Sequence, residues 1–447
     1  MLRKPSAVTL AFGLFLGVLL ITSLVRQSTD TQIVLPGDVY VSWQFVALVP
    51  FALLGIPWIV LRLWQETPIS LLAGGPLFFV YAISVDWLRN GERLSALAVD
   101  SAQVAVPILA AISVFGKRTP AERHHMTRCL VILLVAILTA YALVALLVHT
   151  FDFGDMVISR PPGHENMTFV RLSGPLGVST GLSMILLPAM GFAWQEGRRK
   201  ASYALFWKFA AILLGFYILW TASRLTPLFL GAFLLFACSA RQILLLAYTG
   251  LAVGLAVNLP ESFIPEKWIR LGFSDPGRSM AFDTTWAAFT SSWSSILVGV
   301  GSDRLNVLSQ TVSQVARGEI RFNSWNTDFG DFPYGPHSVL WWSLGSYGIM
   351  GALLRCAPFL APWGKAIAAI VGRRVSLQRL PLVFFSVLIS GIGFFFDDTH
   401  ITHPYLMCVW YLMCLHAVDG FEASLRRTSK QREIVLQEPA LAGAASA

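Results

Sequence analysis

The sequence has 447 residues, of which 55% are hydrophobic and only 13% are charged. Soluble globular domains carry about 25% charged residues, so this composition excludes an ordinary water-soluble fold. The formal net charge of +8 is not accompanied by a nucleic-acid-binding motif or by a basic patch interleaved with aromatic side chains. We therefore expect no nucleic-acid partner.

Apolar runs of about 17 to 25 residues recur from one end of the chain to the other, each long enough to cross a bilayer core of about 30 Å. The runs are continuously apolar rather than alternating, which favours transmembrane helices over a β-barrel. The predicted fold class is an all-α polytopic membrane protein, with residues 1–447 forming a single integral membrane domain. About twelve spans are expected, near residues 8–25, 43–62, 69–86, 95–115, 129–149, 175–194, 203–221, 225–240, 242–259, 338–358, 380–396 and 404–419.

The orientation of the spans follows from where the lysines and arginines lie. The N-terminus, the connections at residues 116–128, 198–200 and 365–379, and the C-terminal tail carry more of them than the opposite side. The positive-inside rule makes this the cytoplasmic side, so both termini should be cytoplasmic. The first apolar run follows a basic start, as in a signal peptide, but no small-x-small cleavage site comes after it. We interpret it as a retained span.

The opposite, outer side carries the longest connection, residues 260–337. A connection of this length is unusual unless it has structure or function of its own. Its segment 277–293, GRSMAFDTTWAAFTSSW, fits an interfacial helix, and segment 303–318, DRLNVLSQTVSQVARG, spaces apolar residues three or four apart along one helix face. We predict a helical periplasmic cap inserted between the ninth and tenth spans.

Three arginines and one histidine on this outer side are candidates for chemistry. Arg224 lies between apolar stretches with almost no polar loop around it. A charge at membrane depth usually faces a partner or a cavity, although Arg224 also fits a snorkelling residue at a tight outer turn. Arg278 begins the predicted interfacial helix, and Arg171 precedes the sixth span. Guanidinium groups bind phosphate oxygens in bidentate fashion. His337 ends the long connection, directly before the tenth span. Its position fits either a general base or a polar helix-start residue.

The other histidines are weaker candidates. His124 and His125 lie in a basic connection and are expected to be solvated, and His416 has no companions of note. A cluster between the last two spans fits either a metal site or a polar hairpin tip; it consists of Asp397, Asp398, His400 and His403. The five cysteines lie in or beside apolar segments without a CxxC pattern, and we interpret them as packing thiols.

An ordered set of short motifs resembles the O-antigen ligase family of bacterial inner-membrane proteins. The set is RLSGPLG from Arg171, SR ending at Arg224, GR ending at Arg278 with a tryptophan eight residues on, GVG at 299–301, and HSVLWWSLGSYGIMG from His337. In the family the histidine is often followed by Asn, where this chain has Ser338. This departure leaves the related O-antigen polymerases and protein O-oligosaccharyltransferases open.

The resemblance implies a C-type, metal-independent, inverting glycosyltransferase without a cofactor. Its donor would be an O-antigen polysaccharide on undecaprenyl diphosphate, and its acceptor a sugar hydroxyl of lipid A–core at the periplasmic face. His337 would be the catalytic base, and Arg224, Arg278 and Arg171 would bind the diphosphate. A transporter of lipid-linked saccharide is the alternative from another class. It needs charges within the spans, and apart from Lys208 the sequence offers few of them.

Overall fold

The computed structural model describes residues 12–18, 32–35, 39–62, 73–90, 94–115, 118–151, 179–199, 203–220, 226–238, 276–302, 305, 338–372, 380–396 and 404–444. Within these residues the chain is helical, as predicted, apart from one short antiparallel hairpin. The hairpin pairs β1 (Gln32–Leu35) with β2 (Val39–Ser42). Its strands consist largely of β-branched and aromatic residues and flank a Pro-Gly-Asp sequence that is typical of a turn.

Helices lie at every predicted span position except 242–259, which is outside the described residues. Beyond the turns at residues 12–18, they are α2 (Trp43–Arg62), α4 (Gly74–Asn90), α5 (Leu94–Phe115), α6 (Pro120–Phe151), α7 (Ser179–Arg198), α8 (Ala204–Trp220), α9 (Thr226–Ala237), α12 (Pro276–Thr290), α13 (Trp293–Val298), α15 (Val339–Val371), α16 (Leu382–Gly393) with the 3-10 turn η5 (Phe394–Phe396), and α18 (Pro404–Ala444).

Three of the described helices are long and apolar enough to cross a membrane: Pro120–Ala140, Val339–Val371 and Tyr405–Arg426. Five further described helices are apolar but shorter. Helices α15 and α18 continue well past the spans predicted for them. Hydropathy marks only the apolar part of α18, whose hydrogen-bonded backbone extends into the polar sequence that follows. Helix α15 instead continues to Val371 through a segment that is apolar apart from Lys365.

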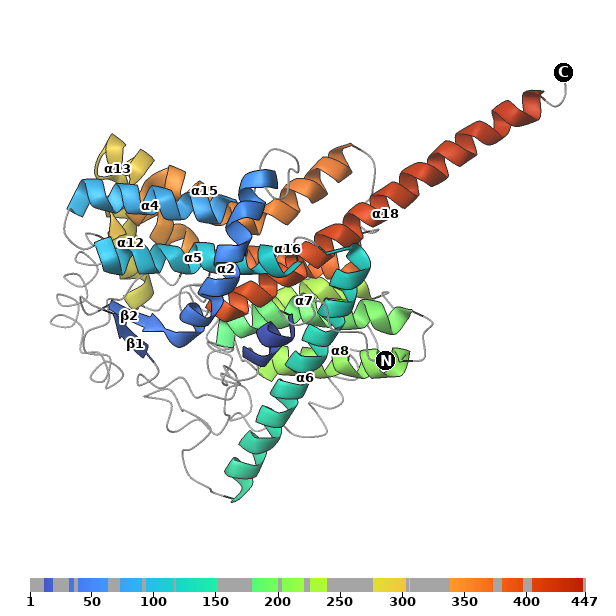
Figure 1. The fold of residues 1–447 in the computed structure, drawn as a ribbon, viewed down its shortest axis with the longest axis horizontal. Coiled ribbons are helices and arrows are strands. Elements are labelled where there is room, and N and C mark those ends of the chain that lie inside the picture. Colours follow the sequence, from blue (N-terminus) through green and yellow to red (C-terminus); the bar gives the residue numbers. More distant parts are fainter. Residues whose placement is uncertain are drawn as a thin grey trace.

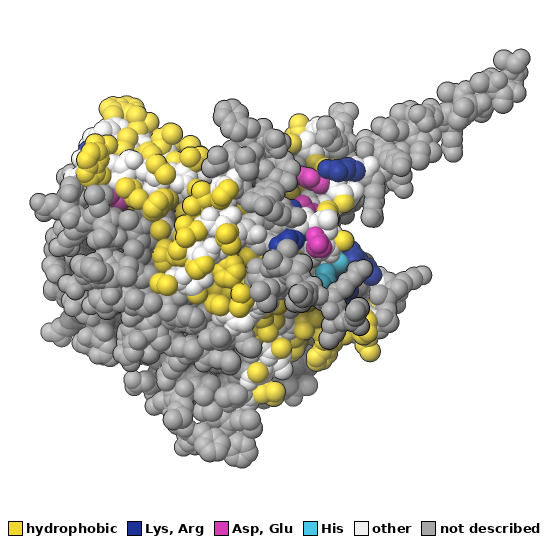
Figure 2. All heavy atoms as spheres, viewed as in Figure 1, with side chains coloured by type: hydrophobic (Ala, Val, Ile, Leu, Met, Phe, Trp, Pro, Cys, Tyr) yellow, Lys and Arg dark blue, Asp and Glu magenta, His cyan; other side chains and the backbone are white. Residues whose placement is uncertain are grey.

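Helix α8 shows why a membrane is the appropriate solvent for this chain. It is apolar apart from Lys208, yet only one of its faces is buried in the protein. The other face presents large apolar side chains that are 55% to 80% exposed, namely Leu205, Phe209, Ile212 and Phe216. Such a face is unfavourable in water and favourable against lipid. Figure 2 shows that hydrophobic side chains also cover much of the described surface on other helices.

Small residues allow the helices to approach closely. A Cβ added at Gly55 of α2 would lie 2.2 Å from the carbonyl oxygen of Leu109 in α5, and one at Gly191 of α7 would lie 2.4 Å from Ser386 Oγ in α16. Helix pairs in membranes associate through this kind of small-residue contact. Deep in the bundle, Trp410 is fully buried and donates a 2.8 Å hydrogen bond to Ser390 Oγ.

The bundle has two different ends along its long axis (Figure 1). Helices α12 and α13 lie at one end together with β1 and β2, and the C-terminal half of α18 projects beyond the other. The predicted interfacial helix 277–293 is present as α12. The second predicted cap helix, 303–318, falls almost wholly outside the described residues. The end that holds α12 and the start of α15 includes the backbone of Arg278 and the residue that directly follows His337 in the sequence.

Candidate functional site

The four predicted site residues differ in how far the structure describes them. His337, Arg224 and Arg171 lie outside the described residues. Arg278 lies in the first turn of α12, and only its backbone is described. The predicted cluster at residues 397–403 is also outside the description. The elements that lead to these residues are described, and their contacts define the surroundings of the site.

Helix α15 begins with a well-defined cap at Ser338. The Ser338 Oγ accepts a hydrogen bond from the backbone N–H of Trp341 at 3.4 Å, as an N-cap side chain does. The same hydroxyl donates to the carbonyl of Phe395 in η5 at 2.6 Å. Ser338 is buried, so this pair of bonds fixes the start of α15 against η5. The helix-start role that the sequence left open for His337 is therefore filled by its neighbour.

The Ser338–Phe395 hydrogen bond joins the chain next to His337 to the chain next to the predicted cluster that begins at Asp397. Ser338 directly follows His337, and Phe395 stands two residues before Asp397. The bond therefore joins the two chain segments that lead to these groups.

Helix α12 packs against the first turns of α15. The ring of Trp286 makes an edge-to-face contact with Trp341, with ring centroids 5.9 Å apart. A Cβ added at Gly345 would lie 2.8 Å from Thr285 Cγ2, so the two helices meet closely. Arg278 stands eight residues before Trp286, which is about 12 Å along a helix axis. The helix that carries Arg278 thus contacts α15 within the first two turns of α15.

The loop after α13 is joined to α15 by backbone hydrogen bonds. Val300 N–H donates to the carbonyl of Gly345 at 3.2 Å, and Gly301 N–H donates to that of Ser346 at 2.8 Å. Helix α15 is kinked at Gly348, which has φ +64°. A Cβ there would lie 2.5 Å from the Leu297 backbone. The glycine is needed both for the left-handed conformation and for this close approach.

A buried carboxylate, missed from the sequence, joins three elements in the same region. Asp86 of α4 is 1% exposed. It accepts hydrogen bonds from the Ser302 backbone N–H at 2.9 Å, from the Ser302 hydroxyl at 3.3 Å and from the Tyr347 hydroxyl at 2.8 Å. Tyr81, on the same helix, donates to the Tyr347 carbonyl at 3.1 Å. These contacts fix the loop after α13 and the kinked part of α15 to α4.

Arg355 of α15 is a second buried charge that the sequence analysis passed over. It is 1% exposed, and its Nη1 lies 3.3 Å from Ser343 Oγ, twelve residues earlier on the same helix. Its guanidinium lies 4.5 Å from the ring centroid of Trp342 and 5.4 Å from that of Phe78. Cation–π contacts of this kind stabilise a desolvated guanidinium. Arg355 is therefore one of the few charges that the sequence offers within the predicted spans, beside Lys208.

The opposite end of the bundle holds a cluster around Glu196, at the C-terminal end of α7. The carboxylate is 6% exposed. It lies 2.6 Å from Arg199 Nη1, 3.4 Å from His124 Nε2 and 3.9 Å from Arg128 Nε. Burial raises the pKa of Glu196, but the His124 hydrogen bond and the positive charges of Arg199 and Arg128 outweigh burial, and the pKa is lowered overall.

Two histidine interpretations made from the sequence are corrected here. His124 is not simply solvated, because its side chain is 25% exposed and pairs with Glu196. His416 does have companions, since its ring centroid lies 5.4 Å from those of His124 and Phe192. The partners come from α6, α7 and α18, and contacts between segments so far apart in the chain leave no spacing pattern in the sequence.

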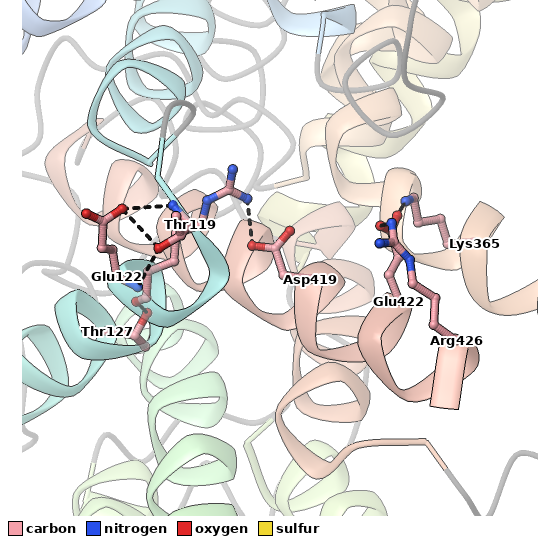
Figure 3. Close-up of polar contacts among 8 residues, drawn as sticks. Thr119, Glu122, Thr127, Lys365, Asp419, Glu422 and Arg426 are labelled. Carbon is pink, nitrogen blue, oxygen red and sulfur yellow. Dashed lines mark hydrogen bonds and ion pairs between the residues drawn. The ribbon is translucent and has the colours of Figure 1, made fainter. Parts of the chain in front are cut away.

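Ion pairs also join α18 to its neighbours at this end (Figure 3). Arg123 Nη1 lies 2.6 Å from Asp419 Oδ2, and Lys365 pairs with Glu422. Arg426, one helical turn further along α18, lies 4.0 Å from Glu422. These pairs link α6, α15 and α18.

The described residues contain no group of three or more metal-ligating side chains. No protein family and no curated protein matches the chain. What the fold defines is a class: the chain is a helical protein with membrane-length apolar helices and lipid-compatible surfaces. The fold alone does not determine the reaction that the protein carries out.

Proposed function

We propose that the protein is an O-antigen ligase of the bacterial inner membrane. In this proposal it transfers an O-antigen polysaccharide from undecaprenyl diphosphate to a sugar hydroxyl of lipid A–core. The proposal starts from the motif set between Arg171 and residue 351. The structural observation that supports it most is the contact between α12, which carries Arg278, and the first turns of α15, which begins directly after His337 and its neighbouring cap residue.

The chemistry assigned to the site is a displacement at the anomeric carbon. The acceptor hydroxyl oxygen forms the new glycosidic bond while the bond from that carbon to the diphosphate breaks. His337 takes the hydroxyl proton, a role suited to imidazole near neutral pH. Arg224, Arg278 and Arg171 stabilise the negative charge that develops on the departing undecaprenyl diphosphate. With three cations at the leaving group, the proposal needs no metal ion.

The proposal includes twelve spans, with both termini in the cytoplasm and residues 260–337 in the periplasm. The two ends of the bundle support this arrangement, because α12 and α13 lie at one end while the basic half of α18 projects from the other (Figure 1). Reporter fusions test the orientation directly. A fusion at residue 120 should be active only with a cytoplasmic reporter, and activity with a periplasmic one would overturn the topology.

Related transferases use the same chemistry with a different acceptor. An O-antigen polymerase would extend a second lipid-linked chain, and a protein O-oligosaccharyltransferase would glycosylate a protein hydroxyl. The acceptor in a reconstituted assay distinguishes the three. Purified protein in proteoliposomes should form product with lipid A–core, and not with a second lipid-linked donor or an acceptor protein alone.

A transporter of lipid-linked saccharide is the second candidate, and buried charges within the helices are the observation that favours it. Asp86 and Arg355 are both 1% exposed. Their described contacts, however, join α4, α15 and the loop after α13, which fits a structural link better than a pathway. Movement of labelled donor between leaflets without acceptor ligation would favour transport, whereas ligated product without such movement would favour transfer.

A further inference from the structure

Lys208 occupies an unusual position on α8. It follows Leu205 by three residues and precedes Ile212 by four, so all three lie on one face of the helix. Leu205 is 80% exposed and Ile212 is 67% exposed. Lys208 has no hydrogen-bond or ion-pair partner among the described residues. An ammonium group on an apolar, lipid-compatible face needs an anion or water at the bilayer boundary.

Two arginines, one in α6 and one directly after α7, add positive charge to the region of Lys208. Gly197 of α7 lies directly against the lysine, since a Cβ added there would be 2.9 Å from Lys208 Cγ. Two residues further on is Arg199, whose side chain is 52% exposed. Arg128 of α6 is 37% exposed. We call Lys208, Arg128 and Arg199 the basic corner.

The basic corner joins α8 to α6 and α7 and keeps an excess of positive charge. The guanidinium of Arg128 lies 5.5 Å from the ring centroid of Trp207, the neighbour of Lys208 in α8. Both arginines approach the carboxylate of Glu196. Two arginines therefore share one carboxylate and remain partly open to solvent, and Lys208 adds a third positive charge on α8.

We propose that the basic corner binds the phosphate of an anionic phospholipid, with the acyl chains lying along the exposed face of α8. Partly exposed guanidinium groups and an ammonium group suit a phosphodiester, and each basic residue near an anionic leaflet adds to lipid binding. The apolar face of α8, with Leu205, Phe209 and Ile212, includes Lys208 itself. A lipid satisfies both the cations and the apolar face, whereas a soluble phosphate satisfies only the cations.

This proposal does not depend on glycan transfer and is tested without any glycan substrate. Purified full-length protein in neutral detergent is mixed with phosphatidylglycerol or phosphatidylcholine, and native mass spectrometry measures the bound lipid. Wild-type protein should bind phosphatidylglycerol more tightly. Lys208→Gln and Arg199→Gln should each weaken that binding about fivefold, and Lys208→Arg should retain most of it.

Arg426→Gln is the matched control, because it removes one positive charge at the same end of the bundle from a side chain that is 84% exposed. It should leave phosphatidylglycerol binding unchanged. Equal affinity of the wild type for the two lipids would overturn the proposal, as would an equal loss in Arg426→Gln. Binding of glycerol phosphate as tight as that of phosphatidylglycerol would overturn the assignment to a lipid. Unchanged phosphatidylglycerol binding in folded Lys208→Gln and Arg199→Gln proteins would overturn the assignment to the basic corner.

Discussion

Replacing Asp86 by Ala tests the link between α4, the loop after α13 and α15. The carboxylate accepts hydrogen bonds from the Ser302 backbone N–H, the Ser302 hydroxyl and the Tyr347 hydroxyl, in a site that is 1% exposed. Hydrogen bonds to a charged group contribute about 1.5–3 kcal/mol each, and every buried donor left without an acceptor costs about 1–3 kcal/mol. The variant also relieves the cost of burying a charge, so the net loss stays below the sum of the bonds. We expect the free energy of unfolding to fall by about 3–5 kcal/mol.

The assay is equilibrium unfolding of purified protein in mixed micelles, followed by circular dichroism. Ser84→Ala is the matched control on the same helix, because the hydroxyl of Ser84 is exposed and, among the described residues, donates only to the Val80 carbonyl of its own helix, at 2.8 Å. It should change the free energy of unfolding by less than about 0.5 kcal/mol. If Asp86→Ala unfolds together with Ser84→Ala, the carboxylate does not hold these elements and the reasoning about the link is wrong.

Three further predictions concern other parts of the molecule. Gly348→Ala should destabilise the fold, because a Cβ would lie 2.5 Å from backbone at φ +64°, whereas Gly231→Ala, with nothing within 4 Å, should be neutral or stabilising in the same unfolding assay. The pKa of Glu196 is lowered from 4.5 in the folded state. The ionised carboxylate therefore stabilises the fold above about pH 4.5, and this stabilisation is lost as the pH falls through the folded-state pKa. Glu196→Gln should flatten that part of the curve of unfolding free energy against pH. If Arg224 and Arg278 bind the diphosphate as planar forks, Arg→Lys at either should slow ligation nearly as much as Arg→Ala, by about 30- to 1000-fold, and normal rates in the Lys variants would exclude that geometry.

The sequence predicted the helical class and the positions of the described helices well, because long apolar runs determine both. It placed the start of α15 near Ser338 and the interfacial helix at residues 277–293, where α12 lies. The length of α18 was underestimated, since hydropathy does not report where a helix ends in polar sequence. The length of α15 was underestimated because its apolar sequence continues beyond the length that one membrane span needs. The β1–β2 hairpin was missed because short alternating strands gave no signal beside the longer apolar runs.

The contacts that organise the site region were beyond the reach of sequence patterns. Asp86 bonds to Ser302 and Tyr347, which are 216 and 261 residues away. A lone acid near the end of an apolar run looks like a boundary residue until the helices are packed. The role of Arg355 was missed for the same reason, because its aromatic neighbour Phe78 comes from another helix. The one available hint was the cost of placing each charge within a span.

The central claim is that His337 acts as a base, and the cap at Ser338 supplies the comparison that tests it. The measurement is the rate of ligation by His337→Asn and Ser338→Ala in proteoliposomes at saturating donor, with donor binding measured separately. His337→Asn should remain folded and bind donor, yet ligate about 100- to 10,000-fold more slowly, because Asn does not take a proton. Ser338→Ala should lose about 1 kcal/mol of stability through the cap and retain most of its turnover. A fully active His337→Asn protein would contradict the account.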